Sequence, residues 1–330
     1  MEEYISNNRY KEHVQEEGTE GINHIEALPK LSSPLIYSKI YIYSGKCDIM
    51  AYKILEKDEI APSIHRMVID APDVAKAAKA GQFIILRLNE FGERIPLTIF
   101  DVENEKGTVS VIFQEMGKTT KQLAKLSAGE SLEDFVGPLG TPADIRNLGN
   151  VILVGGGVGV APIYPLAKAY KKAGNRVISI IGARNKDLLI LEDQMRKVSS
   201  ELFIATDDGS KGHHGFVTDI MKKILDSGEK VARVVIIGPP IMMKVGADVA
   251  SPYDVEILVS LNSIMVDGTG MCGGCRVTID GKTKFTCVDG PEFNARNVDF
   301  VELINRLATY RSEEKRAAEK YEEECRCGLH

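Results

Sequence analysis

The hydrophobic positions of this chain follow two different rhythms along its central part. Between residues 49 and 148, short β-rich runs such as SIHRMVI and GTVSVIFQ are separated by glycine, proline, asparagine and acidic residues. Between residues 149 and 260, continuous apolar runs such as NVILVGG alternate with longer segments of mixed polarity. Such runs are typical of strands that are covered on both faces in a parallel sheet. The first rhythm therefore predicts an antiparallel barrel, and the second predicts a five-stranded doubly wound α/β domain.

The limits of these runs predict the individual elements. In the barrel we expect strands over 50–60, 63–69, 81–88, 95–103 and 107–114, followed by a helix over 117–126. Thr119 and Gln122 have the spacing of a capping box, which marks the start of that helix. In the α/β domain we expect strands over 150–156, 176–182, 201–208, 231–238 and 254–260, separated by helices over 161–173, 186–198, 216–228 and 240–250.

Three further segments flank these two domains. Residues 1–48 show no clear period and are interpreted as an N-terminal extension, which could be disordered or could pack on a partner. Residues 261–298 form a compact module that is rich in glycine and cysteine. Residues 299–330 are interpreted as a C-terminal helix, helical to about residue 324, and a tail that ends in CRCGLH.

Composition narrows the class of protein. With 330 residues, 44% of them hydrophobic and 27% charged, the chain is long enough for about two globular domains. Its net charge of −6 argues against a nucleic-acid surface. The N-terminus is too polar for a secretory signal, and the uncharged residues 150–167 contain four glycines and two prolines. Six cysteines are too few for a disulfide scaffold, so we expect a cytoplasmic protein whose clustered cysteines bind a metal.

Two glycine- and proline-rich loops are candidates for nucleotide binding. The loop VGGGVGVAP, residues 154–162, joins the first strand of the α/β domain to its helix, where backbone N–H groups could contact a diphosphate. It departs from the G-x-G-x-x-G fingerprint because Val160 occupies the sixth position, and a tight turn without a ligand is the alternative. The loop GPP, residues 238–240, follows the fourth strand at the same carboxyl edge, where open α/β sheets bind ligands.

Two motifs in the barrel are less specific. The segment GKTT, residues 117–120, is not a P-loop, because Ile112 stands where the Walker pattern requires glycine. The helix that it begins could still hold a diphosphate, or it could be a plain helix start. The segment RIPLTIF, residues 94–100, places a cation, a proline and a hydroxyl on one strand, which suits ligand contact but also an ordinary strand.

Three clustered cysteines indicate a metal site with one unusual ligand. Cys272 and Cys275 form C-x-x-C, and Cys287 follows. A plant-type [2Fe–2S] site has the spacing C-x4-C-x2-C and then a distant cysteine, and Asp267 occupies the first position of that spacing. A carboxylate there would change the charge of the cluster, whereas the alternative role of Asp267 is a turn residue. Zinc is the rival metal, but it would need a fourth ligand from the tail, such as Cys325 or Cys327.

Taken together, the RIPLT strand, the capped helix and the GGGVGVAP loop resemble the ferredoxin–NADP reductase superfamily over about residues 49–260. The resemblance implies that the first domain binds FAD and the second binds a nicotinamide nucleotide. Pro96 and Leu97 would line the isoalloxazine, and Thr98, the candidate catalytic residue, would hydrogen-bond near its N5 atom. The other implied FAD contacts are Arg94, Thr119 and Thr120 at the diphosphate, Phe113 and Gln114 at the ribityl or adenine part, and Gly117. The implied contacts of the nicotinamide nucleotide are Gly155, Gly156, Gly157, Val158, Gly159, Ala161, Pro162, Arg184, Asp207, Gly238, Pro239 and Pro240.

The cysteine module narrows this family further. A reductase-like pair of domains followed by an iron–sulfur module resembles the electron-transfer subunit of dihydroorotate dehydrogenase, in which the first ligand is cysteine. The segment DGTGMCGGCRV, with aspartate in that place, looks more like the small subunit of NADH-dependent reduced ferredoxin:NADP oxidoreductase, a family also called sulfide dehydrogenase β-subunit. The segments GARNKDLLILEDQM and VDGPEFNA add to this likeness. The metal ligands that it implies are Asp267, Cys272, Cys275 and Cys287.

This family implies an electron relay. A hydride would pass between NAD(H) and FAD, and single electrons would pass between FAD and a [2Fe–2S] cluster that faces a larger catalytic subunit containing flavin and iron–sulfur groups. That hetero-oligomeric partner would bifurcate electrons, so ferredoxin is an indirect partner, and neither nucleic acid nor a membrane is expected to take part.

Three questions stay open from the residues. The chain could instead be the electron-transfer subunit for dihydroorotate or sulfide-linked chemistry. It could also be a nucleotide-binding module that contains zinc. The choice between NAD and NADP is undecided, because no acidic residue ends the second strand of the α/β domain and Arg184 there suits a phosphate.

Overall fold

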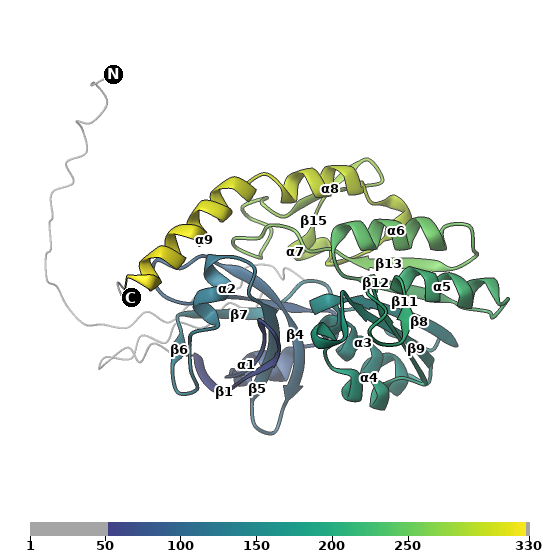
Figure 1. Ribbon diagram of the computed structural model, residues 1–330, viewed down its shortest axis with the longest axis horizontal. Coiled ribbons are helices and arrows are strands. Elements are labelled where there is room, and N and C mark those ends of the chain that lie inside the picture. Colours follow the sequence, from purple (N-terminus) through teal and green to yellow (C-terminus); the bar gives the residue numbers. More distant parts are fainter. Residues whose placement is uncertain (1–51, 328–330) are drawn as a thin grey trace, which may run out of the picture. The chain divides into compact units, whose positions relative to one another are not determined.

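The computed structural model describes residues 52–327 of the chain (Figure 1). The predicted extension over residues 1–48 and the last three residues of the predicted tail lie outside this range. Two seven-stranded sheets and one two-stranded sheet are present among the described residues. No helix in the same range is long and apolar enough to cross a membrane.

The first sheet is an antiparallel near-barrel with the strand order β6-β1-β2-β5-β4-β3-β7. Its strands are β1 (Tyr52–Ala61), β2 (Ile64–Asp70), β3 (Phe83–Arg87), β4 (Ile95–Glu103), β5 (Thr108–Gln114), β6 (Ser131–Leu132) and β7 (Asp134–Leu139). Two short helices, α1 (Pro72–Ala77) and α2 (Lys118–Leu123), accompany them. The alternation along β5 produces two faces, since Val109, Val111 and Phe113 lie in the barrel core while Ile112 packs against the second domain.

The sequence predicted strands β1 to β5 of the barrel and helix α2. It missed β6, β7 and α1, which are short and, in β7, contain glycine and proline. The predicted capping box of Thr119 and Gln122 is wrong. The N-cap is Gly117, and the side-chain oxygen of Thr120 accepts hydrogen bonds from the N–H groups of Met116 and Gly117. Glycine has no side chain with which to cap a helix, so only the half of a capping box in which the N3 side chain accepts from the N-cap N–H is formed.

The second sheet has the order β11-β10-β9-β8-β12-β13-β16. Its parallel strands are β8 (Asn150–Gly156), β9 (Arg176–Ala183), β10 (Glu201–Thr206), β11 (His213–His214), β12 (Arg233–Ile237) and β13 (Glu256–Ser260), and β16 (Glu292–Asn294) is antiparallel to β13. The helices are α3 (Val160–Lys172), α4 (Glu192–Val198), α5 (Val217–Asp226) and α6 (Pro240–Ala250). Helices α3 and α4 contribute to the core on one face and α5 and α6 to the core on the other, which explains why the central strands are apolar throughout.

The five predicted strands of this domain and three of its four helices are confirmed. The helix predicted over residues 186–198 is wrong in its first half. The structure has a 3-10 turn, η2 (Lys186–Leu188), and then α4, separated by Leu191 in a left-handed conformation with φ +60°. The side chain of Asn185 caps the 3-10 turn by accepting hydrogen bonds from the N–H groups of Asp187 and Leu188. This local capping competes with a continuous helix.

The glycine- and cysteine-rich module consists of a hairpin and a single helical turn. The hairpin pairs β14 (Arg276–Ile279) with β15 (Lys282–Phe285), and α7 (Thr286–Asp289) follows it. The chain then enters β16, which joins the module to the edge of the second sheet through β13. The predicted C-terminal helix is divided in two, α8 (Phe300–Leu307) and α9 (Arg311–Arg326), with a 3-10 turn η3 (Ala295–Asn297) before them.

Two packed contacts position the barrel against the other parts of the chain. Near the α/β domain, the rings of Phe100 and Tyr164 have centroids 4.8 Å apart, within a core cluster that includes Ile64 and Ile112 of the barrel. Near the cysteine module, β3 packs against the two buried cysteines. The barrel therefore contacts both parts of the chain that the sequence assigned to the other redox groups.

Candidate cofactor sites

The predicted metal ligands lie in two adjacent pairs. The Oδ1 atom of Asp267 is 3.4 Å from the Sγ atom of Cys272, and the Sγ atoms of Cys275 and Cys287 are 3.2 Å apart. No three His, Cys, Asp or Glu side chains of the described residues converge as a single metal ion requires. A two-iron cluster distributes its protein ligands over two irons, so this paired arrangement fits a [2Fe–2S] group better than a tetrahedral zinc ion.

The carboxylate of Asp267 is held in its ionised form by the backbone. Burial works against ionisation, but N–H groups of Thr269 and Cys272 donate hydrogen bonds of 3.1 and 2.9 Å to its oxygens and hold its pKa below the usual range. Because a metal ligand must be deprotonated, this environment prepares Asp267 for ligation. The same hydrogen bonds would also suit a turn residue, so they are compatible with both predicted roles.

The buried thiol of Cys287 has the opposite tendency. Cys275 and Cys287 are each 2% exposed, and burial together with the neighbouring Cys275 raises the pKa of Cys287 to about 12. A bound cation reverses such a shift because it stabilises the thiolate directly. The backbone carbonyl of Cys275 accepts hydrogen bonds from both the N–H and the hydroxyl of Thr286, which fixes the two cysteine-bearing segments against each other.

Glycine shapes the loop that carries the ligands. Gly268, Gly270 and Gly273 all have positive φ, between 65° and 87°, where residues with a side chain are strained. Gly268 also lies against the barrel, since a Cβ atom there would be 2.6 Å from Ile85 Cδ1 and 2.7 Å from Leu139 Cδ1. The loop thus reaches the barrel surface at the residue that follows Asp267.

Cys325, one of the two tail cysteines, contacts a lysine of the barrel. The Sγ atom of Cys325 lies 2.7 Å from the Nζ atom of Lys125, which follows α2 in the barrel. A zinc site that takes Cys325 as its fourth ligand would have to break this contact, whereas Cys327, the other tail cysteine, is exposed.

The strand that carries the predicted flavin contacts lies beside the cysteine pair. Pro96 is paired with Ile85, and Thr98 with Phe83, across β4 and β3. Directly paired residues of antiparallel strands point to the same face. Because Phe83 and Ile85 pack with Cys275 and Cys287, that face also contacts the candidate cluster site. Pro96 and Thr98 are only half-buried, and within the described part of the chain the Thr98 hydroxyl has no hydrogen-bond partner. An unsatisfied hydroxyl on this face fits the predicted contact with the flavin.

Other predicted FAD contacts are engaged within the protein. Thr119 is 5% exposed and its hydroxyl donates a hydrogen bond to Glu93. Arg94 forms an ion pair of 2.8 Å with Asp134. Phe113 lies in the barrel core, stacked on His65 with ring centroids 5.4 Å apart. Gln114, at the end of the same strand, is half-buried. The roles of these residues at FAD stay predictions.

Sequence reasoning missed two acidic residues at this site, Glu93 and Asp134. Asp134 also pairs with Arg87 at 2.7 Å, and although burial opposes its ionisation, Arg87 and Arg94 hold the pKa of this carboxyl below its usual range. Glu93 directly precedes the RIPLT segment in the sequence. The place of Glu93 beside this segment could be read from the sequence. Its contact with Thr119 could not, because that contact depends on how closely the turn that carries Glu93 approaches α2.

The two predicted nucleotide loops meet at the carboxyl edge of the second sheet. A Cβ atom on Gly159 would lie 2.4 Å from the carbonyl oxygen of Ile237, and one on Gly156 would lie 2.3 Å from Met242 Sδ. Gly238 is in the same contact, since a Cβ atom there would lie 2.5 Å from Met242 Cε. Gly157 differs from these residues, because it has φ +58° and faces open space. Gly157 is therefore the glycine of this edge that a diphosphate can approach most closely.

The remaining predicted contacts surround this edge. Arg184 and Asp207 are exposed at the ends of β9 and β10, where the N–H of Asp207 donates to the carbonyl of Ala183 and that of Asp208 to the carbonyl of Arg184. The other members of the predicted set lie on the two loops and at the starts of the following helices: Gly155, Val158, Ala161, Pro162, Pro239 and Pro240. The structure thus gathers the whole predicted set at one edge, and its contacts with a nucleotide stay a prediction.

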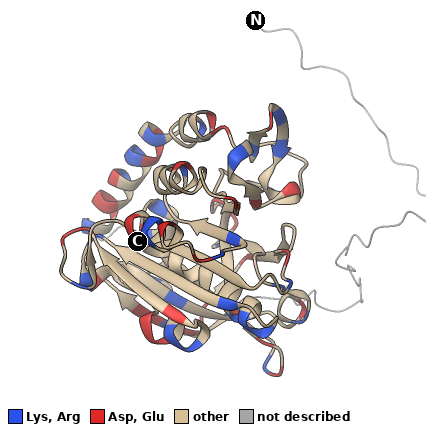
Figure 2. Ribbon diagram, turned by 90° about the vertical axis from the view of Figure 1, so that its right-hand side faces the viewer, with Lys and Arg blue, Asp and Glu red and all other residues tan. Residues whose placement is uncertain are grey.

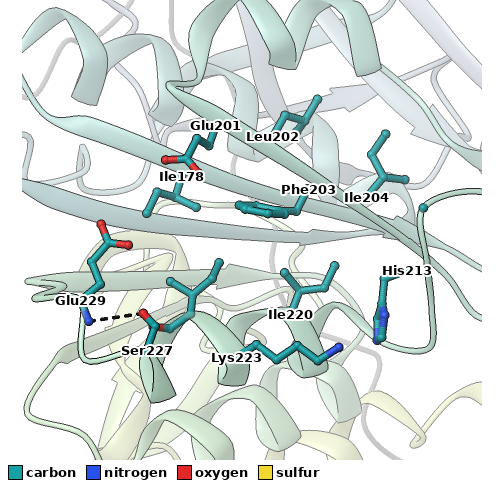
Figure 3. A pocket seen from close by; sticks show the side chains of 12 residues that line it. Ile178, Glu201, Leu202, Phe203, Ile204, His213, Ile220, Lys223, Ser227 and Glu229 are labelled. Carbon is teal, nitrogen blue, oxygen red and sulfur yellow. Dashed lines mark hydrogen bonds between the residues drawn. The ribbon is translucent and has the colours of Figure 1, made fainter.

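A separate cavity of about 610 Å³ lies away from this edge, between β10 and α5 (Figure 3). Its lining is mainly aliphatic and aromatic, including Phe203 and Ile220. Glu201 and Glu229 lie at one end and both pair with Arg176, so this end offers no unpaired cation for a phosphate. It contains none of the predicted cofactor residues.

Comparison with known proteins agrees with this arrangement. Residues 262–299 match the family model of the iron–sulfur cluster binding domain of dihydroorotate dehydrogenase B. Residues 153–248 match the model of the oxidoreductase NAD-binding domain. The two matches coincide with the cysteine module and with the second sheet.

Whole-chain relatives decide the family. The chain is 49% identical over 269 residues to a homologue of the dihydroorotate dehydrogenase B (NAD⁺) electron-transfer subunit from Thermotoga maritima, which is 82% of this chain and 95% of the relative. It is 34% identical over 249 residues to the electron-transfer subunit from Desulforamulus reducens, which is 73% of this chain and 94% of the relative. The chain belongs to this family of electron-transfer subunits.

Membership of the family fixes the coarse biochemistry. The chain is an FAD- and NAD-binding oxidoreductase subunit with an iron–sulfur cluster binding domain. A solved structure also resembles this electron-transfer subunit over most of its length. That structure, of an NADH-dependent reduced ferredoxin-NADP oxidoreductase studied for flavin-based electron bifurcation, matches with a TM-score of 0.78 and 47% identity, over 84% of this chain and 99% of the other.

Proposed function

We propose that this chain is the electron-transfer subunit of a bifurcating NADH-dependent reduced ferredoxin:NADP oxidoreductase, with a [2Fe–2S] cluster held by Asp267, Cys272, Cys275 and Cys287. The observation that carries the proposal is the position of Asp267. Its carboxylate lies 3.4 Å from the Cys272 sulfur, where a first cysteine ligand is expected. The solved structure of such an oxidoreductase, at 47% identity, supports this choice among members of the family.

The chain's own residues arrange the redox groups in order. Asp267 and Cys272 would hold the outer side of the cluster, since Cys272 is exposed, and the buried Cys275 and Cys287 would hold the side next to the barrel. Pro96 and Thr98 would bind the flavin on the face that they share with Ile85 and Phe83. Bound FAD would exchange electron pairs with a nicotinamide and single electrons with the cluster. The direct packing of β3 on Cys275 and Cys287 supports a short path between the two groups.

The exposed side of the cluster loop suits a partner subunit. Met271 is 87% exposed, and Val266 and Val288 are 53% and 44% exposed. Gly270, next to Met271, lies against the side chain of Val288, so these apolar residues border the exposed Cys272. Apolar groups beside an exposed metal ligand are typical of a protein–protein interface. We propose that the larger flavin- and iron–sulfur-containing subunit docks here, and that ferredoxin reaches this chain only through that subunit.

The choice between NAD and NADP rests on the resemblance to the small subunit of NADH-dependent reduced ferredoxin:NADP oxidoreductase. Asp207 and Arg184 lie on adjacent strand ends and could contact a ribose hydroxyl and a phosphate, respectively. We propose NAD(H) as the bound form, and affinity measurements for NADH and NADPH would distinguish the two.

A second candidate is the electron-transfer subunit of a dihydroorotate dehydrogenase. The match of residues 262–299 to the cluster domain of that enzyme supports it. In that case the partner would be a dihydroorotate-oxidising subunit.

The decisive experiment purifies the chain anaerobically with its native partner. The proposal predicts NADP⁺ reduction that depends on both NADH and reduced ferredoxin, and no oxidation of dihydroorotate. Dihydroorotate-dependent NAD⁺ reduction would establish the second candidate instead. Absence of both flavin and iron–sulfur absorption would exclude the two together.

The role of Asp267 can be tested by two substitutions. Asp267→Ala is expected to lose most of the cluster iron, because one iron loses a ligand, whereas Asp267→Cys is expected to keep the cluster and change its reduction potential. Iron and acid-labile sulfide analysis and redox titration measure the two effects. If both variants keep the wild-type iron content and potential, Asp267 is only a turn residue.

A further inference from the structure

The C-terminal helix α9 contacts the barrel at α2, far from it in the sequence (Figure 1). Tyr321 is the one buried residue of α9, with 5% of its surface exposed. The rest of the helix is strongly polar, and acidic and basic residues are interleaved along it (Figure 2). A helix of this composition has little apolar surface to anchor it. Its attachment therefore depends on a few specific contacts around Tyr321.

Those contacts all involve the segment of α2 and the residues that follow it. The Nζ atom of Lys125 lies 4.7 Å from the centroid of the Tyr321 ring and 2.7 Å from the Sγ atom of Cys325. Lys121, one turn earlier, forms an ion pair with Glu322. A cation over an aromatic ring and an ion pair one turn away define both the position and the direction of α9 on α2.

Helix α2 needs such support. It has only six residues, and its buried residues are Thr119 and Leu123. Isolated helices of this length are not stable in water, so tertiary contacts must hold α2 in place. Leu123 packs into the barrel core on one side, and Lys57 of β1 donates hydrogen bonds to the carbonyls of Ala124 and Leu126 at the helix end. Helix α9 supplies the support on the remaining side.

The other end of the helix pair is attached beside the cluster loop. Helix α8 packs against α6 and β14. A guanidinium nitrogen of Arg306 donates a hydrogen bond of 3.2 Å to the carbonyl of Gly274, which lies between Cys272 and Cys275. The pair α8–α9 thus extends from the cluster loop to the helix that begins with the predicted diphosphate-binding residues.

We propose that α9 is a strap that positions α2 for FAD, with Tyr321 as a positioning residue that acts through Lys125 and α2. This inference rests on the proposed function and on the predicted contacts of Thr119 and Thr120, in the first turn of α2, with the diphosphate of FAD. Residues 311–326 then control how tightly FAD is retained, although their contacts are with α2. The chemistry of the cluster ligands is not part of this role, so FAD retention and iron content should respond differently.

The test compares FAD retention with iron content in the full chain. Tyr321→Ala is expected to raise the dissociation constant of FAD by about two- to thirtyfold, the range in which connected packing contacts modulate a distant site. Tyr321→Phe keeps the ring under Lys125 but removes the hydroxyl that interacts with it, so this variant should hold FAD more tightly than Tyr321→Ala. Lys315→Ala, on an exposed part of the same helix, is the matched control and should have no effect. Flavin fluorescence on release measures FAD, and acid-labile sulfide measures the cluster.

The ion pair provides an independent arm that does not disturb the buried ring. Glu322→Lys places like charges opposite Lys121 and should weaken FAD retention, and the double variant Lys121→Glu with Glu322→Lys should recover it. The strap is excluded if Tyr321→Ala and Glu322→Lys both hold FAD as tightly as wild type. Equal loss of FAD and cluster, with a lower unfolding temperature, would also exclude it, because that result indicates general destabilisation. A wild-type protein that binds no FAD at all would overturn the proposed function itself.

Discussion

The nucleotide loop, residues 154–162, and the cluster loop, residues 266–277, both depend on glycine, but they do so against different neighbours. In the nucleotide loop, Gly159 lies against backbone atoms, with the carbonyl oxygen of Ile237 at 2.4 Å from the place of a Cβ atom. In the cluster loop, Gly268 has φ +75° and lies against the ends of two side chains, Ile85 and Leu139. Backbone cannot yield without moving a strand, whereas side-chain ends can change rotamer. The difference predicts which substitution is the more costly.

The largest effect is expected for Gly159→Ala. Its methyl group would displace the loop after β12, at a cost of about 3 kcal/mol or more, because overpacking against backbone has no local relief. We expect a lower unfolding temperature and much weaker NADH binding, with the iron content per folded molecule unchanged. Calorimetry, NADH titration and iron analysis measure the three quantities.

Gly157→Ala is the control in the same loop. Gly157 has φ +58° but no atom within 4 Å of a Cβ position, so only the backbone strain of about 1–2 kcal/mol remains. If Gly159→Ala is no more destabilising than Gly157→Ala, the close approach of the two loops does not limit this edge.

A smaller effect is expected for Gly268→Ala. The strain of a left-handed alanine costs about 1–2 kcal/mol, and Ile85 and Leu139 must also move. Because Gly268 follows Asp267, we expect reduced cluster content while NADH affinity is retained. Iron and sulfide analysis after anaerobic reconstitution measures the loss.

Gly281→Ala separates strain from contact. Gly281 has φ +69° in the hairpin turn between β14 and β15, and a Cβ atom there would meet nothing within 4 Å. The Gly281→Ala variant should keep its cluster. Equal iron loss in Gly268→Ala and Gly281→Ala would show that strain alone, and not the contact of the cluster loop with the barrel, determines cluster binding.

These contrasts also show what the sequence could and could not predict. Strands β1 to β5, β8 to β10, β12 and β13 follow from period and turn residues, and the edge where Gly159 and Gly238 meet follows from the rule for parallel sheets. The spacing of Asp267, Cys272, Cys275 and Cys287 predicted ligands that the structure does bring together in two pairs. Whether a glycine is required by its own torsion angle or by a neighbour is decided by tertiary packing, which no spacing encodes.

The same limit explains the errors. The helix over 186–198 is broken because the Asn185 side chain caps a 3-10 turn. The N-cap of α2 is Gly117, whose N–H donates to the hydroxyl of Thr120. Both are local hydrogen bonds that compete with the regular pattern. The contact between Glu93 and Thr119 joins two distant segments and needed the fold.

A last effect, which concerns stability and not cofactor content, involves the strand that joins the cluster module to the nucleotide sheet. Glu292 on β16 is paired with Ser260 of the nucleotide sheet, and burial raises its pKa to about 7. Arg233 favours the charged form of this carboxyl, but Asp144 and Glu256 oppose it. Because the ordinary value is 4.5, the folded protein binds more protons than the unfolded chain between about pH 4.5 and 7. Stability contributed by this group is therefore present below pH 4.5 and is lost as the pH rises towards 7.

Glu292→Gln should remove that loss. At pH 8 the variant is expected to be more stable than wild type by up to about 3 kcal/mol, and at pH 4.5 the two should be nearly equal. Urea unfolding at several pH values measures the difference, with Glu319→Gln on exposed α9 as a control that should follow wild type. A wild-type stability that is flat or rises between pH 5 and 7, relative to Glu292→Gln, would mean that Glu292 is already ionised in the fold. The junction of β16 with the nucleotide sheet would then tolerate a charge as well as the exposed surface of α9 does. The difference between backbone neighbours, which cannot yield, and side-chain neighbours, which can, would apply only to the two glycine loops.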